Sequence, residues 1–401
     1  MKRFILTLLA ALALFQLPSF ACTSVIVSGK ATPDGRPLMW KNRDTGNKEN
    51  HVMHFPATDG CYSFVALVNS PSKNPHSIWI GTNSEGFSIM NTQSYNITAE
   101  QDKDKDDDNG GFMKRALEKC ASIEDFEKYL SELPKPWNVS ANIGVIDAKG
   151  GAAYYEINYT EYFKFDANET EEGYLIRTNY SLNGRPVTEG RGCVRYMEAE
   201  KMMKEAYEFT PDFIFDKLSR NWANPLLGFD YRSPEYKNEW ALEFDTITRY
   251  NTTCSVVVQG VRSGENPSLT TMWTIVGYPG TTVALPVWEC AGEEGLPKSL
   301  RRGEDGLSPL SHYGYLLKQK VYCFDLDDAE INQRYFKWSL LWNEDGSGYL
   351  QMVQALENEL LYGYKIALKK WYEAGKPDME ELSRLNKAAD ERIEAVYSAN
   401  I

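Results

Sequence analysis

A cysteine that directly follows a cleavable leader is the residue of this chain best placed to do chemistry. Residues 1–21 show a short basic start, an apolar run over residues 4–17 and a small-x-small ending at Ala21. This order is typical of a signal peptide, and we expect cleavage after Ala21. Cys22 would then be the first residue of an exported chain, periplasmic or secreted.

An N-terminal cysteine carries both a nucleophile and a base. Its α-amine titrates near pKa ~7.7–8.0 and its thiol near pKa ~8.5, so the amine can accept the thiol proton without a histidine. Such a pair can attack a carbonyl carbon and hold the acyl group as a thioester. The chemistry that Cys22 predicts is therefore amide hydrolysis or acyl transfer, and an uncleaved peptide bond before it would remove the base.

Two other interpretations of Cys22 stay open at this point. A cysteine after a leader is also the site where bacterial lipoproteins are acylated, which would make the chain a lipid-anchored binding module. Ser19 and Phe20 suit ordinary signal peptidase better than lipoprotein processing. The third interpretation is a plain disulfide, and the sequence does not choose among the pairings of the other six cysteines. These are Cys61, Cys120, Cys193, Cys254, Cys290 and Cys323.

Charge and composition disfavour several classes of partner. The formal net charge is −13, which disfavours nucleic acid and anionic membrane surfaces. After the leader, no stretch reaches the roughly 18 apolar residues that a membrane-spanning helix needs. The cysteine and histidine spacings do not suggest a zinc site, so neither a metal nor another cofactor is predicted. We expect a small-molecule amide substrate, and a homo-oligomer stays open.

Local patterns predict the elements that position Cys22. Residues 22–28 alternate with a strand period, and residues 37–42 return as a second strand after a Pro-Asp-Gly turn. His51 and His54 fall in a stretch that reads as a loop. Further strands are expected at residues 62–68, 77–81, 86–91, 141–147, 152–158, 162–165, 174–178, 254–260, 272–277 and 282–285. Helices are expected at residues 112–121, 123–133, 193–207, 211–220, 350–374 and 379–399. Blocks of strands broken by helix pairs favour an α+β fold.

Several segments resemble, in chain order, the cysteine N-terminal nucleophile (Ntn) hydrolases. This superfamily of linear amide hydrolases includes choloylglycine hydrolases, penicillin V acylases, the acyltransferase-like family (peptidase C45) and secreted dipeptidases (peptidase C69). The resembling segments are Cys22-Thr23, the turn at residues 31–35, Lys41-Asn42-Arg43-Asp44, residues 83–91, Thr178-Asn179-Tyr180 and Val194-Arg195-Tyr196. The resemblance covers residues 22–290.

The resemblance implies roles for the charged residues near Cys22. Asp44 matches the family aspartate that orients the α-amine and the substrate. Lys41 stands where the family has Arg, so either Lys41 or Arg43 would be the cation that faces Cys22. Lysine keeps the charge but lacks the planar fork of arginine.

The same resemblance implies the groups that stabilise charge in the transition state. The Asn179 side-chain amide would donate to the oxyanion. Asn91 would be a second donor, with Gln93 as its alternate. Arg195 would be the active-site arginine before a helix, with Arg191 as the near competitor.

The resemblance finally implies the fold and the reaction. It implies a four-layer αββα sandwich with two antiparallel sheets over residues 22–320, after the signal peptide 1–21. Residues 321–401 would form a helical C-terminal extension packed on the core. The implied activity is hydrolysis of a linear amide without a cofactor. An acyltransferase similar to acyl-CoA:6-aminopenicillanate acyltransferase, or a dipeptidase, is the alternative on the same scaffold.

Overall fold

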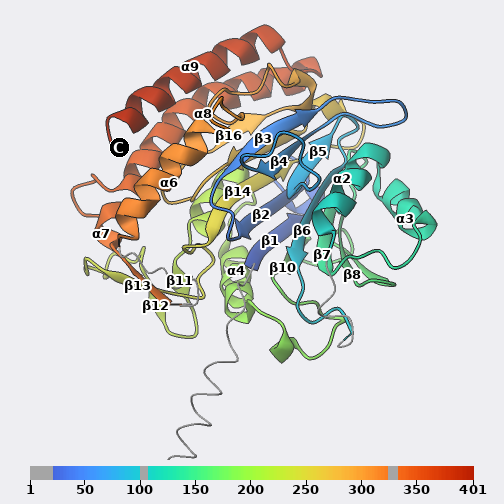
Figure 1. The fold of residues 1–401 in the computed structure, drawn as a ribbon, viewed down its shortest axis with the longest axis horizontal. Coiled ribbons are helices and arrows are strands. Elements are labelled where there is room, and N and C mark those ends of the chain that lie inside the picture. The colour runs from blue at the N-terminus through green and yellow to red at the C-terminus, as the bar shows by residue number, and fades with distance from the viewer. Residues whose placement is uncertain (1–20, 100–106, 324–332) are drawn as a thin grey trace, which may run out of the picture.

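The computed structural model describes residues 21–99, 107–323 and 333–401. Two antiparallel sheets stack in its centre and helices cover their outer faces, so the layers run helix, sheet, sheet, helix (Figure 1). This is the α+β αββα sandwich expected from the sequence.

The first sheet has six strands in the order β10-β1-β2-β14-β15-β16. Their bounds are β1 Ala21–Val27, β2 Leu38–Asp44, β10 Tyr174–Arg177, β14 Thr252–Gln259, β15 Thr271–Ile275 and β16 Leu285–Val287. Strands β1 and β2 form the hairpin predicted at the start of the chain, with Cys22 paired to Arg43 and Val27 to Leu38. Strand β2 lies inside the sheet, between β1 and β14, so hydrogen bonds hold it on both edges.

The second sheet has seven strands in sequence order, each antiparallel to the next. Their bounds are β3 Asn50–Phe55, β4 Phe64–Asn69, β5 Ile80–Asn83, β6 Ser88–Gln93, β7 Ala141–Ile146, β8 Ala152–Ile157 and β9 Tyr162–Asp166. The interpretation of His51 and His54 as loop residues was wrong, because both lie in β3. The two histidines obscured the apolar residues of this strand in the sequence pattern.

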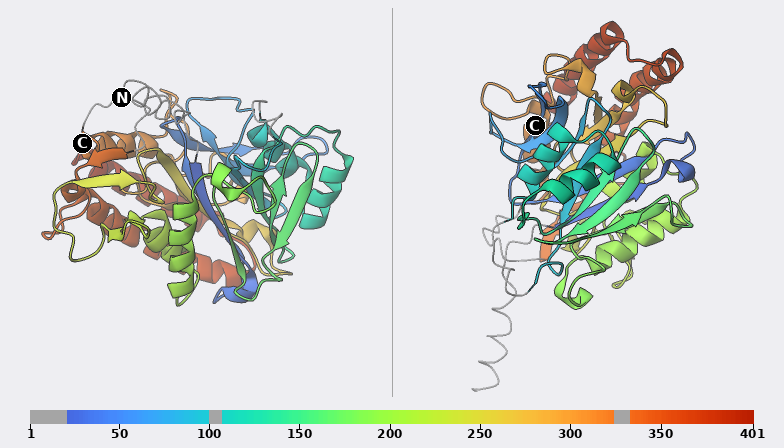
Figure 2. Two further views of the ribbon diagram at one scale, coloured as in Figure 1. Left: turned by 90° about the horizontal axis from the view of Figure 1, so that it is seen from below. Right: turned by 90° about the vertical axis from the view of Figure 1, so that its right-hand side faces the viewer.

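Helices cover the outer face of each sheet (Figures 1 and 2). On the second sheet these are α2 Asn109–Lys119 and α3 Ile123–Glu132, which bury Phe112 and Phe126 against Ile143 and Tyr155. On the side of the first sheet they are α4 Cys193–Glu205, α6 Pro309–Val321, α8 Tyr349–Ala374 and α9 Met379–Ser398. Among the described residues, no helix is long and apolar enough to cross a membrane.

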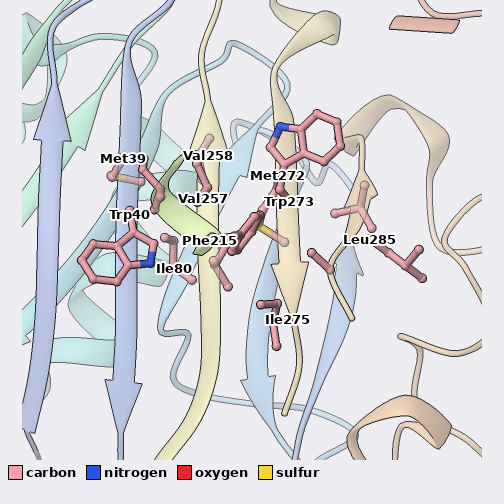
Figure 3. Packing of buried hydrophobic residues seen from close by; sticks show 14 of the residues in the cluster. Met39, Trp40, Ile80, Phe215, Val257, Val258, Met272, Trp273, Ile275 and Leu285 are labelled. Atoms are coloured by element: carbon pink, nitrogen blue, oxygen red, sulfur yellow. The ribbon is translucent and has the colours of Figure 1, made fainter. Parts of the chain in front are cut away.

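Side chains of the last two helices belong to the main hydrophobic core. Leu368, Trp371 and Ile393 are buried in the same cluster as the strands of the first sheet. Figure 3 shows part of this cluster: Met39, Trp40, Ile80, Phe215, Val257, Val258, Met272, Trp273, Ile275 and Leu285. A buried bidentate ion pair also joins α8 to the chain around residue 220, because both terminal nitrogens of Arg220 donate to the Glu357 carboxylate at 2.8 and 2.7 Å. The helices are therefore packed as part of the sandwich.

The segment expected as one helix over residues 211–220 has a different form. It is a short turn, α5 Pro211–Phe213, followed by the π-helix η5 Ile214–Ser219. The wider turn of η5 buries Ile214, Phe215 and Leu218 in the main core. The remaining short helices are η2 Gly29–Ala31, η4 Val187–Glu189, η6 Pro267–Leu269 and η7 Glu289–Ala291.

A smaller aromatic cluster lies at one flank of the sandwich. It surrounds two short strand pairs, β11 Ala223–Asn224 with β12 Phe229–Asp230 and β13 Ala241–Phe244 with β17 Gln333–Phe336, and the turn α7 Trp338–Leu341. Trp222, Tyr278 and Trp338 are buried there. Because β13 pairs with β17, the expected C-terminal extension (residues 321–401) shares a small sheet with the chain before it.

Candidate active site

Cys22 lies at the start of β1, in a row of side chains across three strands. It pairs with Arg43 of β2, which pairs on its other side with Cys254 of β14. Residues directly opposite each other in antiparallel strands share one face of a sheet, so these three side chains share a face. Lys41 is two positions along β2 and shares that face. Its Nζ donates to Oδ1 of Asn91 in the second sheet at 2.7 Å, so the row faces the inside of the sandwich.

The backbone of Cys22 is held from the neighbouring strand. Its N–H donates to Oδ1 of Asn179 at 2.8 Å, and Asn179 follows β10, which pairs with β1. The Asn179 Nδ2 donates to the backbone oxygen of Gln93 at 2.8 Å, which fixes the amide with its oxygen toward Cys22. Asn179 thus holds the nitrogen of Cys22 in this geometry. Its role as an oxyanion donor stays a prediction.

Arg195 contacts Cys22 from the first turn of α4. Its Nη1 donates to the Cys22 carbonyl oxygen at 2.5 Å and to Thr23 Oγ1 at 2.9 Å. Its Nη2 donates to the same Asn179 oxygen at 2.9 Å, and its Nε to Asp245 Oδ1 at 3.2 Å. The guanidinium is 1% exposed; burial lowers its pKa, as does the charge of nearby Arg249. Four hydrogen bonds therefore fix this side chain against the Cys22 backbone.

The residues just before α4 decide which arginine reaches Cys22. Gly192 has φ +87°, and a Cβ there would lie 2.3 Å from Nη2 of Arg195, so only glycine leaves room for the guanidinium. Arg191 instead places its guanidinium 4.9 Å from the centre of the Tyr95 ring, and its backbone N–H donates to the Asn179 carbonyl oxygen. Of the two arginines proposed from the sequence, Arg195 is the one in contact with Cys22.

Lys41 and Arg43 are both buried beside Cys22 and bond neutral groups. Lys41 Nζ also donates to the Trp79 carbonyl oxygen at 3.2 Å. Arg43 Nη1 donates to Asn50 Oδ1 at 2.8 Å, and the guanidinium lies 4.1 Å from the centre of the Trp79 ring. Burial lowers the pKa of both cations, that of Arg43 to about 10, while the Cys22 thiol acts in the opposite direction. Both candidates for the cation near Cys22 are thus present at once.

The alternate second donor, Gln93, is turned away from these cations. Its Nε2 donates to Asp107, two residues before α2, and its Oε1 accepts from Asn109, the first residue of α2. Asn91 is the residue of this pair that contacts Lys41. Only the backbone oxygen of Gln93 reaches the site, through Asn179.

Asp44 anchors a chain of ion pairs that the sequence did not reveal. Its Oδ2 accepts from Arg249 Nε at 2.7 Å and its Oδ1 from Thr252 Oγ1 at 2.7 Å. Arg249 Nη1 also lies 3.5 Å from Asp245, the partner of Arg195. Burial alone would lower the pKa of Arg249, but the charges of Asp44 and Asp245 raise it above its usual value. Opposite charges four residues apart, Asp245 and Arg249, were the one available signal.

The cysteines give no support to a disulfide at Cys22. All seven lie in the described part of the chain, and all are free. Cys254, the nearest in the sheet, is two strands away from Cys22, about 9.5 Å between Cα atoms, whereas a disulfide needs less than about 7 Å. Burial raises the pKa of the Cys254 thiol to about 12, although Arg43 and Lys41 act to lower it. Cys254 therefore stays protonated at neutral pH.

One protein-family model matches part of the sequence of this chain. Residues 31–212 match the family described as acyl-coenzyme A:6-aminopenicillanic acid acyl-transferase. The matched range contains every site residue named from the sequence except Cys22, which precedes it. This match confirms the resemblance to the Ntn hydrolases. No curated protein sequence matches the chain.

Three of the solved structures that match this chain have low sequence identity to it. One is a Caenorhabditis elegans N-acylethanolamine-hydrolyzing acid amidase ortholog, with 14% identity, 61% of this chain and 93% of that chain covered, and a TM-score of 0.39. Another is a variant of the conjugated bile acid hydrolase from Clostridium perfringens, with 14% identity, 67% and 92% covered, and a TM-score of 0.41. A third is penicillin V acylase from Agrobacterium tumefaciens, with 12% identity, 67% and 86% covered, and a TM-score of 0.39.

Proposed function

Because residues 31–212 match an acyl-transferring Ntn family, we propose that this chain is an exported cysteine hydrolase that cleaves a linear amide bond. The reaction passes through a thioester on Cys22. The observation that carries the proposal is the convergence on one backbone unit: Asn179 accepts from the Cys22 nitrogen while Arg195 donates to the Cys22 oxygen. These bonds orient an N-terminal cysteine and leave its thiol free to react.

Removal of residues 1–21 is the step that activates Cys22. Its nitrogen then becomes an amine, which keeps a hydrogen bond to Asn179 and offers a lone pair to the thiol proton. In the full chain Ala21 is 1% exposed and pairs with Asp44 in the sheet. Loss of Ala21 therefore opens space beside Asp44, the residue that the family resemblance assigns to orient the new amine.

The chemical steps use the row of side chains on the inner face. The amine takes the thiol proton, and Lys41 and Arg43 favour the resulting thiolate. The thiolate attacks the amide carbon. Among the described residues the Asn91 Nδ2 has no hydrogen-bond partner, so it can donate to the oxyanion, and one such donor contributes about 2.7–4 kcal/mol. The amine returns the proton to the leaving nitrogen, and water then releases the acyl group from Cys22.

The proposal is tested with the purified chain and two variants, Cys22→Ala and Cys22→Ser. We expect the wild type to release amine from at least one member of a panel of N-acyl amino acids, bile-acid conjugates, penicillin V and dipeptides. Both variants should lose turnover and keep the thermal unfolding temperature within a few degrees. An acyl adduct on Cys22 that hydroxylamine removes would identify the thioester. Turnover retained in Cys22→Ala would overturn the assignment.

Two competing functions are separated by mass and product analysis. An intact mass that starts at an unmodified Cys22 supports catalysis, whereas a diacylglyceryl adduct would identify a lipid-anchored binding module. For an acyltransferase on the same scaffold, an added amine acceptor would receive the acyl group in place of water. Free acid as the sole product with the acceptor present identifies the hydrolase.

A further inference from the structure

Two buried cations beside Cys22 bond no carboxylate of the residues that the structure describes. Lys41 is 1% exposed and Arg43 is 4% exposed, yet among the described residues neither bonds a carboxylate. The carboxylates nearby are already held by other arginines, Asp44 by Arg249 and Asp245 by Arg195. Burying a cation without a counter-charge is costly, so a partner for this charge is expected from elsewhere.

The Cys22 thiolate can offset only one of these charges, and only for part of the reaction. Burial lowers the pKa of Lys41, and its Nζ already donates to Asn91 Oδ1 and to the Trp79 carbonyl oxygen. Arg43 keeps its charge at neutral pH, because its pKa is lowered only to about 10. When Cys22 becomes a neutral thioester, the positive charge of Arg43 has no anionic partner in the part of the chain that the structure describes.

The guanidinium of Arg43 is fixed with one edge unoccupied. Its Nη1 donates to Asn50, whose own Nδ2 donates to the Thr253 carbonyl oxygen at 2.9 Å and thereby fixes the acceptor. The Trp79 ring covers the face of the guanidinium. Its Nε and Nη2 have no hydrogen-bond partner among the described residues. These two N–H groups form the edge that binds both oxygens of a carboxylate in parallel.

We propose that Arg43 binds a carboxylate of the substrate, so that the preferred amides are N-acyl amino acids with a free α-carboxylate. This inference rests on the proposed function and names its substrate class. Cys22 and Arg43 are directly opposite each other, with Cβ atoms about 4.5–5.5 Å apart. In an N-acyl amino acid the carboxylate carbon is three bonds from the scissile carbonyl carbon. One substrate can therefore reach the thiol and the guanidinium together.

The test compares two substrates that differ only in charge, an N-acylglycine and the matching N-acylglycinamide. We expect the wild type to prefer the acid, and Arg43→Gln to reduce the ratio of the two kcat/KM values by about tenfold or more. Arg43→Lys, which keeps the charge and loses the fork, should give an intermediate ratio. Arg36→Gln is the matched control, because it removes a buried arginine at the far end of the same hairpin. Its ratio should equal that of the wild type.

A binding measurement separates this inference from the proposed function. Calorimetry on Cys22→Ala and on Cys22→Ala/Arg43→Gln, with the acid and the amide as ligands, reports carboxylate recognition without turnover. Preference for the acid in the first protein and its loss in the second supports the inference even if no amide is hydrolysed. Equal affinity for acid and amide in the first protein would overturn it while leaving hydrolysis through Cys22 intact. An equal fall of both kcat/KM values in Arg43→Gln would also overturn it.

Discussion

Replacing Arg195 by lysine tests whether the guanidinium fork orients the nucleophile. Arg195 joins the Cys22 carbonyl oxygen, Thr23, Asn179 and Asp245 through three different nitrogens. A lysine has a single nitrogen, so it cannot reach both Cys22 and Asp245, which bond opposite ends of the guanidinium. We expect the fold to persist, while the backbone of Cys22 is held by fewer hydrogen bonds.

The size of the effect follows from the number of bonds lost. A hydrogen bond that involves a charged group contributes about 1.5–3 kcal/mol. If the equivalent of one such bond is missing in the transition state, kcat/KM falls by about 10-fold to 150-fold, since about 1.36 kcal/mol is tenfold. The assay is kcat/KM on the best amide of the panel, with thermal unfolding measured in parallel.

Arg191→Lys is the matched control, because Arg191 lies four residues earlier and contacts Tyr95 instead of the Cys22 backbone. We expect less than a fivefold change for this variant, on the order of one weak contact. An Arg195→Lys enzyme within threefold of the wild type would refute the argument. So would an equal loss in both variants.

Two further predictions concern stability. Glu357→Gln should reduce the free energy of unfolding by about 3–5 kcal/mol in urea titrations, because it leaves the buried charge of Arg220 unpaired; Glu359→Gln, which removes an exposed ion pair on the same helix, should cost less than about 1 kcal/mol. Burial, assisted by Arg302, lowers the pKa of His51 to about 4, so the unfolded chain binds more protons than the folded one between pH 4 and its ordinary value near 6.5. The wild type should therefore lose stability as the pH falls through that window, and His51→Gln should lose less; parallel pH profiles of the two urea midpoints would contradict this reasoning.

The sequence predicted those parts of the site that depend on local periodicity and chain order. The alternation of residues 22–28 and the turn after it were enough to place Cys22 opposite the segment Lys41–Asp44. The order of the later segments identified Asn179 and Arg195, which the structure brings to the same backbone unit.

The parts that sequence reasoning missed depend on contacts across long chain separations. Arg249 lies in the turn before β14 and reaches Asp44 only because β14 pairs with β2. Asp245, which contacts both Arg195 and Arg249, has a backbone φ of +46°. No local pattern in the sequence indicated this conformation. The six-residue π-helix η5 was expected as part of an ordinary helix over residues 211–220, because the spacing of Ile214, Phe215 and Leu218 resembles that of an α-helix.

The alternation of strand β2 also limits where a cation can be placed beside Cys22. Lys41 and Arg43 point inward, whereas Asn42 donates to Ser219 and Thr248 on the other face of the sheet. A mutation that moves the cation by one position would place it on the other face of the sheet, but a shift of two positions keeps it on the same face as Cys22. Positions 41 and 43 can therefore each hold a cation beside Cys22, whereas position 42 cannot, because its side chain lies on the other face of the sheet.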